Sequence, residues 1–130
     1  MIRILVVDDD RAVASSIAMS LEYEGFSVVT AASGNAGIAA VEEAGVDLAI
    51  VDIFMPGSDG LETIAAMRQR QPDLPIIAFS GFAPRHAARP AADKLAAAID
   101  LGAARALEKP IRRREIVDAV YSCLGEGAAA

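Results

Sequence analysis

The sequence lacks several features, and each absence narrows what the protein can be. A single cysteine, Cys123, among 130 residues allows no internal disulfide and fits a reducing cytoplasm. No apolar run approaches the roughly 20 residues that a membrane-spanning helix needs, and the first residues lack the length and cleavage site of a signal peptide. Basic residues are too few for a nucleic-acid-binding surface, since 12 stand against 18 acidic residues and the net charge is −6. We therefore expect a cytoplasmic protein with no membrane or nucleic-acid partner.

The length of the chain is that of one domain with a single hydrophobic core. Hydrophobic residues make up 54% of it, and alanine supplies much of that share, which is typical of closely packed helices. We expect one domain over residues 1–124. The small residues 125–130 are expected to form a mobile tail that is too short to be an output domain.

Short apolar runs alternate with segments of helical periodicity five times. This alternation predicts an α/β fold in which a five-stranded parallel sheet carries helices on both faces, with right-handed crossovers. Leu95, Ile99 and Ile116 are predicted core residues. The predicted elements are, in order, strand 4–7, a helix capped by Asp10 and ended by Gly25, strand 26–31, a helix from Ser33 to about Gly45, strand 47–52, helix 60–71, strand 76–79, helix 91–101, strand 105–108 and helix 112–124.

Asp52 ends the central apolar run abruptly, and the turn-rich residues 56–60 follow it. The carboxyl ends of strands are where open α/β sheets bind their ligands. A role for Asp52 as the cap of the next helix is disfavoured, because Ser58 and Asp59 lie closer to that helix. Asp52 is therefore a candidate functional carboxylate.

Asp8 and Asp9 end the first strand in the same way, and they would meet Asp52 if the first and third strands are neighbours. Clustered carboxylates repel one another, so such a cluster either holds a proton or binds a cation, and Mg²⁺ prefers oxygen ligands. Ser80 and Lys109 follow two further strands at the same edge. A hydroxyl can donate to one phosphoryl oxygen and an ammonium can neutralise another. These residue types together predict a site for phosphoryl transfer.

The motifs in this order resemble the receiver domain of two-component response regulators. The resemblance covers Ile2 to about Leu124, and its motifs are weak singly but specific in combination. It implies a flavodoxin-like, doubly wound (βα)5 fold with strand order 2-1-3-4-5. The motifs are Leu5-Val6-Val7-Asp8-Asp9, then Asp52 with Met55-Pro56 and Asp59-Gly60, then Ser80-Gly81, and finally Lys109-Pro110.

The resemblance also implies a metal site. Asp9, Asp52 and the backbone carbonyl of Phe54 would ligate Mg²⁺ directly, and Mn²⁺ could substitute for it. Asp8 would act largely through a metal-bound water.

By the same resemblance, Asp52 is the phosphoacceptor. It would take the phosphoryl group from a phosphohistidine on a histidine kinase or a histidine phosphotransfer protein, and the domain would then signal to a downstream protein by protein–protein contacts. Lys109 would contact the phosphoryl group, and Ser80 would reorient toward it. The bond between Lys109 and Pro110 resembles the cis-proline of the family.

Three features depart from the usual pattern of the family. Ala106 stands where an aromatic residue that rotates inward on activation is common, which leaves the activation step open. The segment from Ser80 to Lys109 is longer than expected, as in some stand-alone receivers. No output domain is evident, so we expect a single-domain response regulator that is not an enzyme.

Arginines cluster near the last predicted helix. Arg112, Arg113 and Arg114 occupy its first turn, where positive charge opposes the helix dipole, and Arg105 is expected nearby. This region is the usual face for partner contacts in receivers. We therefore hypothesise a docking surface for a partner, against the alternative of a solvated face offset by neighbouring acids.

Two other functions stay open. A Mg²⁺-dependent aspartyl-phosphate phosphatase of the haloacid dehalogenase type also uses an aspartate at a strand end, but it usually has a second aspartate where Phe54 stands here. A receiver-like module that signals without phosphorylation is the other alternative, and Ala106 keeps it open.

Overall fold

The computed structural model describes residues 1–55, 58–80, 91–108 and 111–125, and leaves undescribed the side chains of residues 58–59 and 91–95. Strands and helices alternate along it as the sequence predicts. In the described residues no helix is both long and apolar enough to cross a bilayer. The elements are β1 (Arg3–Val7), α1 (Arg11–Tyr23), β2 (Ser27–Ala31), α2 (Gly34–Ala44), β3 (Leu48–Asp52), β4 (Phe54–Met55), β5 (Ser58–Asp59), α3 (Gly60–Arg70), β6 (Ile76–Ser80), α4 (Ala91–Asp100), β7 (Arg105–Glu108) and α5 (Arg113–Leu124).

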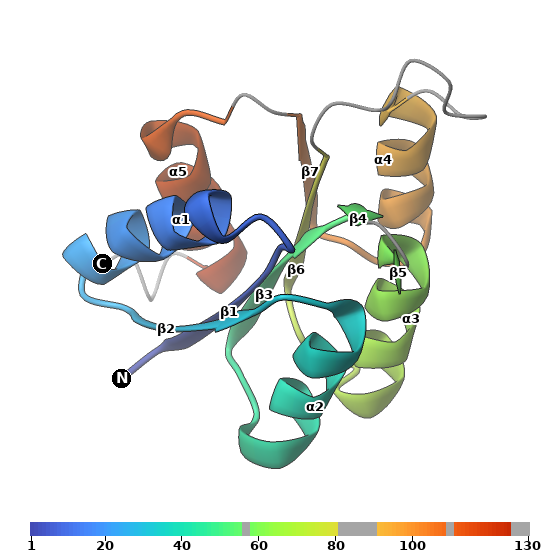
Figure 1. Ribbon diagram of the computed structural model, residues 1–130, viewed down its shortest axis with the longest axis horizontal. Coiled ribbons are helices and arrows are strands. Elements are labelled where there is room, and N and C mark those ends of the chain that lie inside the picture. Colours follow the sequence, from blue (N-terminus) through green and yellow to red (C-terminus); the bar gives the residue numbers. More distant parts are fainter. Residues whose placement is uncertain (56–57, 81–90, 109–110, 126–130) are drawn as a thin grey trace.

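Five of the strands form one parallel sheet in the order β2-β1-β3-β6-β7 (Figure 1). Numbered along the chain, these five strands have the predicted order 2-1-3-4-5. Val7 is paired with Val51, and Asp52 with Phe79, so β1, β3 and β6 end close together. Parallel strands all end at the same edge, and this register therefore brings the predicted site residues to one place.

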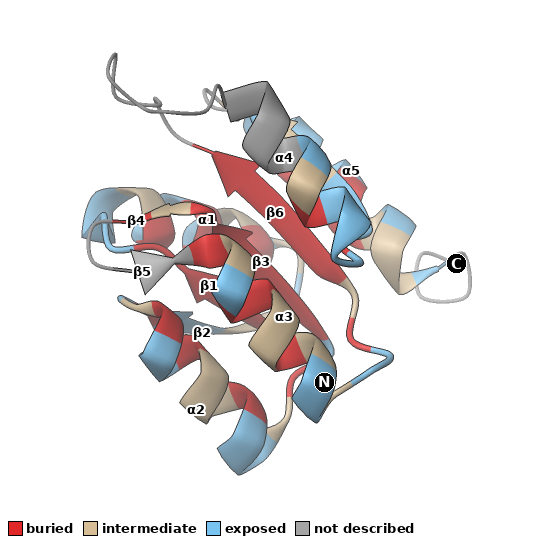
Figure 2. Ribbon diagram, turned by 90° about the vertical axis from the view of Figure 1, so that its right-hand side faces the viewer, coloured by how far each residue is buried: buried red, intermediate tan, exposed pale blue. Residues whose placement is uncertain are grey.

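The sheet separates two hydrophobic clusters. In β1, Ile4 and Val6 belong to the cluster under α1 and α5, whereas Leu5 and Val7 belong to the cluster under α2 and α3. This alternation follows from the two-residue period of a strand. Every residue of the inner strands β3 and β6 is buried (Figure 2). The edge strands β2 and β7 are partly exposed.

Both predicted helix caps are confirmed. The Asp10 side chain accepts hydrogen bonds from the backbone N–H groups of Ala12 and Val13, and the Ser33 hydroxyl accepts one from Ala36. These bonds satisfy N–H groups that have no partner within their own helices. They fix where α1 and α2 begin, and α1 begins soon after β1, the strand that leads to Asp8 and Asp9.

Two details of the fold differ from the prediction. Ile99 is 44% exposed and is therefore wrong as a core residue, because α4 turns the neighbouring Ala98 to the interior instead. Ile116 is buried as predicted, and Leu95 lies outside the described side chains. The second difference is a short antiparallel pair of strands, β4 and β5, in the segment that the sequence suggests is a loop.

Candidate functional site

Three carboxylates converge at the carboxyl edge of the sheet. One carboxylate oxygen from each of Asp8, Asp9 and Asp52 lies within 4.8 Å of the others. Asp8 and Asp52 are buried, at 1% and 3% exposure, whereas Asp9 is exposed. The predicted convergence of these three residues is confirmed.

Backbone contacts orient the two buried carboxylates. Asp8 accepts a hydrogen bond from the backbone N–H of Asp10 at 2.9 Å, and Asp52 accepts one from the backbone N–H of Phe54, also at 2.9 Å. Each carboxylate therefore bonds to the chain two residues ahead. The bond to Phe54 did not follow from the sequence, because it depends on the turn that the backbone makes after β3.

The start of α3 packs directly on the end of β3. A Cβ atom added to Gly60 would lie 2.3 Å from the Cα of Ile53 and 2.8 Å from the carbonyl oxygen of Asp52. Only a glycine permits this approach, because real Cβ atoms do not come so close to backbone atoms. Gly60 therefore sets the position of α3 relative to the Asp52 carboxylate.

Ser80 is the last residue of β6, the strand that lies next to β3 on the side opposite β1. It is 1% exposed, and its hydroxyl has no hydrogen-bond partner among the described residues. Lys109 follows directly after Glu108, which is paired with Ser80 in the sheet. The Lys109 side chain and the bond to Pro110 lie outside the described residues, as do residues 81–90 of the long segment after Ser80.

The four arginines of the hypothesised docking surface do not form one group. Arg105 donates a hydrogen bond to the Ser122 hydroxyl at 2.5 Å, near the carboxyl end of α5. Arg112 precedes the first residue of that helix, and its backbone N–H bonds to Glu115 at 3.4 Å. Arg113 and Arg114 follow Arg112 at this amino end, so the helix separates the three of them from Arg105.

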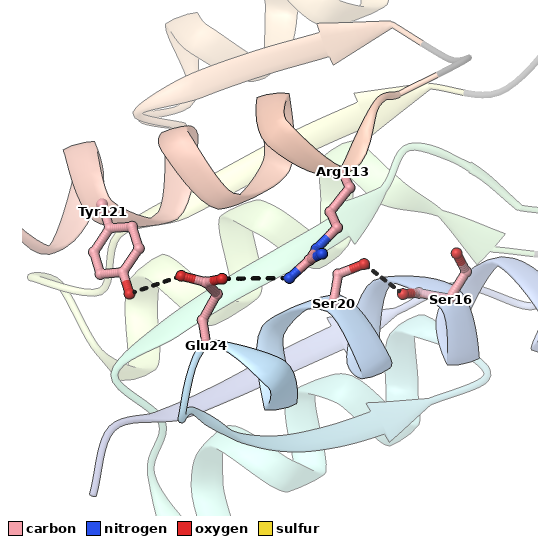
Figure 3. A network of polar contacts seen from close by, with 5 residues as sticks. All are labelled: Ser16, Ser20, Glu24, Arg113 and Tyr121. Carbon is pink, nitrogen blue, oxygen red and sulfur yellow. Dashed lines mark hydrogen bonds and ion pairs between the residues drawn. The ribbon is translucent and has the colours of Figure 1, made fainter.

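Arg113 takes part in a network that joins α5 to α1 (Figure 3). Its guanidinium lies 3.3 Å from the Glu24 carboxylate and 4.5 Å from the centre of the Tyr23 ring. The Tyr121 hydroxyl donates to the same carboxylate at 3.2 Å, and its ring lies against Phe26, with 5.4 Å between centroids. Burial, followed by the hydrogen bond to Glu24 and its negative charge, raises the pKa of Tyr121 above its usual 10.0.

A parallel α/β sheet with three carboxylates and a buried hydroxyl at its carboxyl edge defines a class of proteins that handle phosphoryl groups and metal ions. The response regulator receiver domain matches residues 4–121 as a family. The chain belongs to this family, whose members are the signalling domains of two-component systems and typically accept a phosphoryl group and bind Mg²⁺.

Curated relatives of the chain carry the same family name. Response regulator MprA of Mycolicibacterium vanbaalenii is 36% identical over 116 residues, which are 89% of this chain and 47% of MprA. MprA of Mycobacterium avium is 36% identical over 115 residues. The chain therefore spans about half the length of the curated relatives that it matches.

Solved structures agree with this assignment. A CheY-like receiver domain protein from Methanospirillum hungatei has a TM-score of 0.86 at 29% identity, and the match covers 99% of this chain and 98% of that one. A response regulator from Burkholderia pseudomallei has a TM-score of 0.80 at 26% identity, covering 99% and 72%. That structure contains a phosphorylated aspartic acid, a calcium ion and citrate.

Proposed function

We propose that this receiver domain accepts a phosphoryl group on Asp52, with Mg²⁺ held by the neighbouring carboxylates. The observation that carries this proposal is the combination of a buried carboxylate cluster with a buried hydroxyl, Ser80, that has no partner among the described residues. A buried polar group without a hydrogen bond costs about 1–3 kcal/mol. A phosphoryl oxygen on Asp52 would give that hydroxyl an acceptor.

The dimensions of the cluster fit one magnesium ion. Mg²⁺ binds oxygen ligands at about 2.0–2.1 Å in an octahedron, so two direct ligands lie at most about 4.2 Å apart. The carboxylate oxygens lie within 4.8 Å of one another. This spacing supports a single ion shared by the cluster, and the family resemblance gives the proposed division: Asp9 and Asp52 as direct ligands and Asp8 through water. Bound there, the ion would neutralise charge on the phosphoryl oxygens.

The β4–β5 pair supports the backbone carbonyl of Phe54 as a further ligand. Phe54 is paired with Asp59 in this short sheet, and its backbone N–H donates to the Asp52 carboxylate at 2.9 Å. The Phe54 backbone therefore lies next to Asp52, and this proximity supports its carbonyl as a candidate ligand.

The transfer step proposed for Asp52 exchanges one bond to phosphorus for another. A carboxylate oxygen of Asp52 forms an O–P bond while the N–P bond of a phosphohistidine breaks. The departing nitrogen keeps the bonding electron pair, and a proton on the other ring nitrogen makes the leaving group a neutral imidazole. Ser80 and Lys109 then hold the phosphoryl oxygens, since each can donate to a different one.

The partners proposed are a histidine kinase or histidine phosphotransfer protein as donor and a downstream protein as receiver of the signal, both in the cytoplasm. We also propose that the domain acts without an attached output domain. The longer MprA relatives, of which the chain spans about half, are the alternative. The mass of the protein isolated from its own cells distinguishes a stand-alone domain from a longer protein with an output domain.

Intact-mass spectrometry tests the proposed function. The protein is incubated with acetyl phosphate or phosphoramidate and Mg²⁺, and samples are quenched in acid at intervals. We expect one added phosphoryl group that is absent with a chelator and in the Asp52→Asn variant. Asp47→Asn is the matched control, because Asp47 stands beside the other end of β3 and bonds the backbone of Arg3. An adduct that persists in Asp52→Asn would exclude Asp52 as the acceptor.

One observation favours signalling without phosphorylation as a second candidate. Ala106 on β7 is half-buried and packs against the cluster under α2 and α3, so no aromatic ring is present there to change its rotamer. An unmodified mass with both donors, together with no response to beryllofluoride and Mg²⁺, would favour this second function.

A further inference from the structure

Arg11 is the first residue of α1 and stands next to the acidic cluster. Its side chain is exposed, and it lines a pocket of about 310 Å³ together with the buried Asp8. The other lining residues have small side chains. They are Ala14, Ser15, Thr30, Ala31 and Ala32.

The charge of Arg11 is not neutralised locally. The ion pairs found in the described part of the chain involve Arg70 and Arg113, not Arg11. Asp10, its neighbour in sequence, uses its carboxylate to cap α1. Arg11 is therefore a positive charge that shares a pocket with one member of the carboxylate cluster, Asp8.

The position of Arg11 is unfavourable for the helix itself. A cation at the amino end of a helix opposes the helix dipole, and the first turn of α1 contains no acidic residue. Helix stability therefore gives no reason for an arginine here. Coulomb's law gives a different reason for an arginine at this position: its positive charge acts on the adjacent carboxylate site.

We propose that Arg11 sets the charge balance of the site. Its positive charge weakens Mg²⁺ binding and strengthens binding of the phosphoryl group. This inference rests on the proposed function of Asp52. The cation repels a divalent metal ion at the carboxylates and attracts the negative charge that a phosphoryl group adds there. Arg11 would act in addition to Lys109, so its removal should shift the balance further toward the metal and away from the anion.

The two opposite effects give the proposal a distinctive test. Mg²⁺ affinity is measured by calorimetry, and beryllofluoride affinity at saturating Mg²⁺ is measured by NMR. For Arg11→Gln we expect Mg²⁺ to bind about two- to fivefold more tightly and beryllofluoride to bind more weakly by a similar factor. Both changes should shrink at about 0.5 M salt, because the charges are screened. Arg11→Lys should restore both affinities.

Arg3→Gln is the matched control, because it changes the net charge equally but lies at the opposite end of β1. Equal effects from Arg3→Gln would overturn the proposal, as would an Arg11→Gln variant whose two affinities stay unchanged or move in the same direction. Failure of the proposed function would give a different result. The wild-type protein itself would then show no response to beryllofluoride, although its Mg²⁺ affinity could still be compared with that of the variant.

Discussion

Replacing Ser80 by alanine should make the unphosphorylated domain more stable. The Ser80 hydroxyl is buried at 1% exposure and finds no partner among the described residues. Leaving such a group unsatisfied costs about 1–3 kcal/mol, and alanine removes it with little change in volume. We expect the free energy of unfolding to rise by about 1 kcal/mol and the midpoint of thermal unfolding by about 4 °C.

Urea unfolding followed by far-ultraviolet circular dichroism measures this change, since the chain has no tryptophan. Ser33→Ala is the matched control, for which we expect the free energy of unfolding to fall. Its hydroxyl accepts a hydrogen bond from the Ala36 backbone at 3.1 Å, and losing that helix cap should cost about 1 kcal/mol. If Ser80→Ala were less stable than the wild-type protein, the Ser80 hydroxyl would have a hydrogen-bond partner in solution. The argument that this hydroxyl lacks an acceptor until Asp52 is phosphorylated would then fail.

Two further substitutions test the packing around the site. Gly60→Ala should destabilise the domain by about 1–3 kcal/mol, because its Cβ would lie 2.3 Å from the backbone of Ile53; a stability within error of wild type in urea would contradict that contact. Glu24→Gln should cost up to about 1 kcal/mol by removing the ion pair with Arg113. It should also lower the pKa of Tyr121, as measured by ultraviolet titration. In the wild-type protein that raised pKa stabilises the fold below pH 10, and this contribution is lost as the pH rises through the folded-state value.

The inner strands and the acidic cluster could be predicted from the sequence because their signals are local and strong. An unbroken apolar run such as Ile4–Val7 fits few structures other than a strand buried on both faces. Asp8 and Asp52 each end such a run, and parallel strands place their carboxyl ends together. The caps Asp10 and Ser33 were equally predictable, since each precedes a helix whose first N–H groups need an acceptor.

The remaining features depend on contacts that a periodic pattern does not carry. In the alanine-rich α4 any of several faces can turn inward, so the prediction of Ile99 as a core residue was wrong and Ala98 is buried instead. The β4–β5 pair is two residues long on each side, too short for an alternation to show. The pocket beside Arg11 exists because α1 and β2 meet there, and the sequence signal that could have found it is a basic residue directly after the acidic run.

The most direct test of the proposed site is a two-step NMR titration of the wild-type protein. Mg²⁺ alone should shift the backbone signals around Asp8, Asp9 and Asp52. Beryllofluoride added afterwards should shift Ser80, whose hydroxyl would gain an acceptor, and Asp52→Asn should abolish this second step. A Ser80 signal that stays unchanged in the wild-type protein, or that responds equally in Asp52→Asn, would contradict the proposal that these residues form one phosphoryl-accepting site.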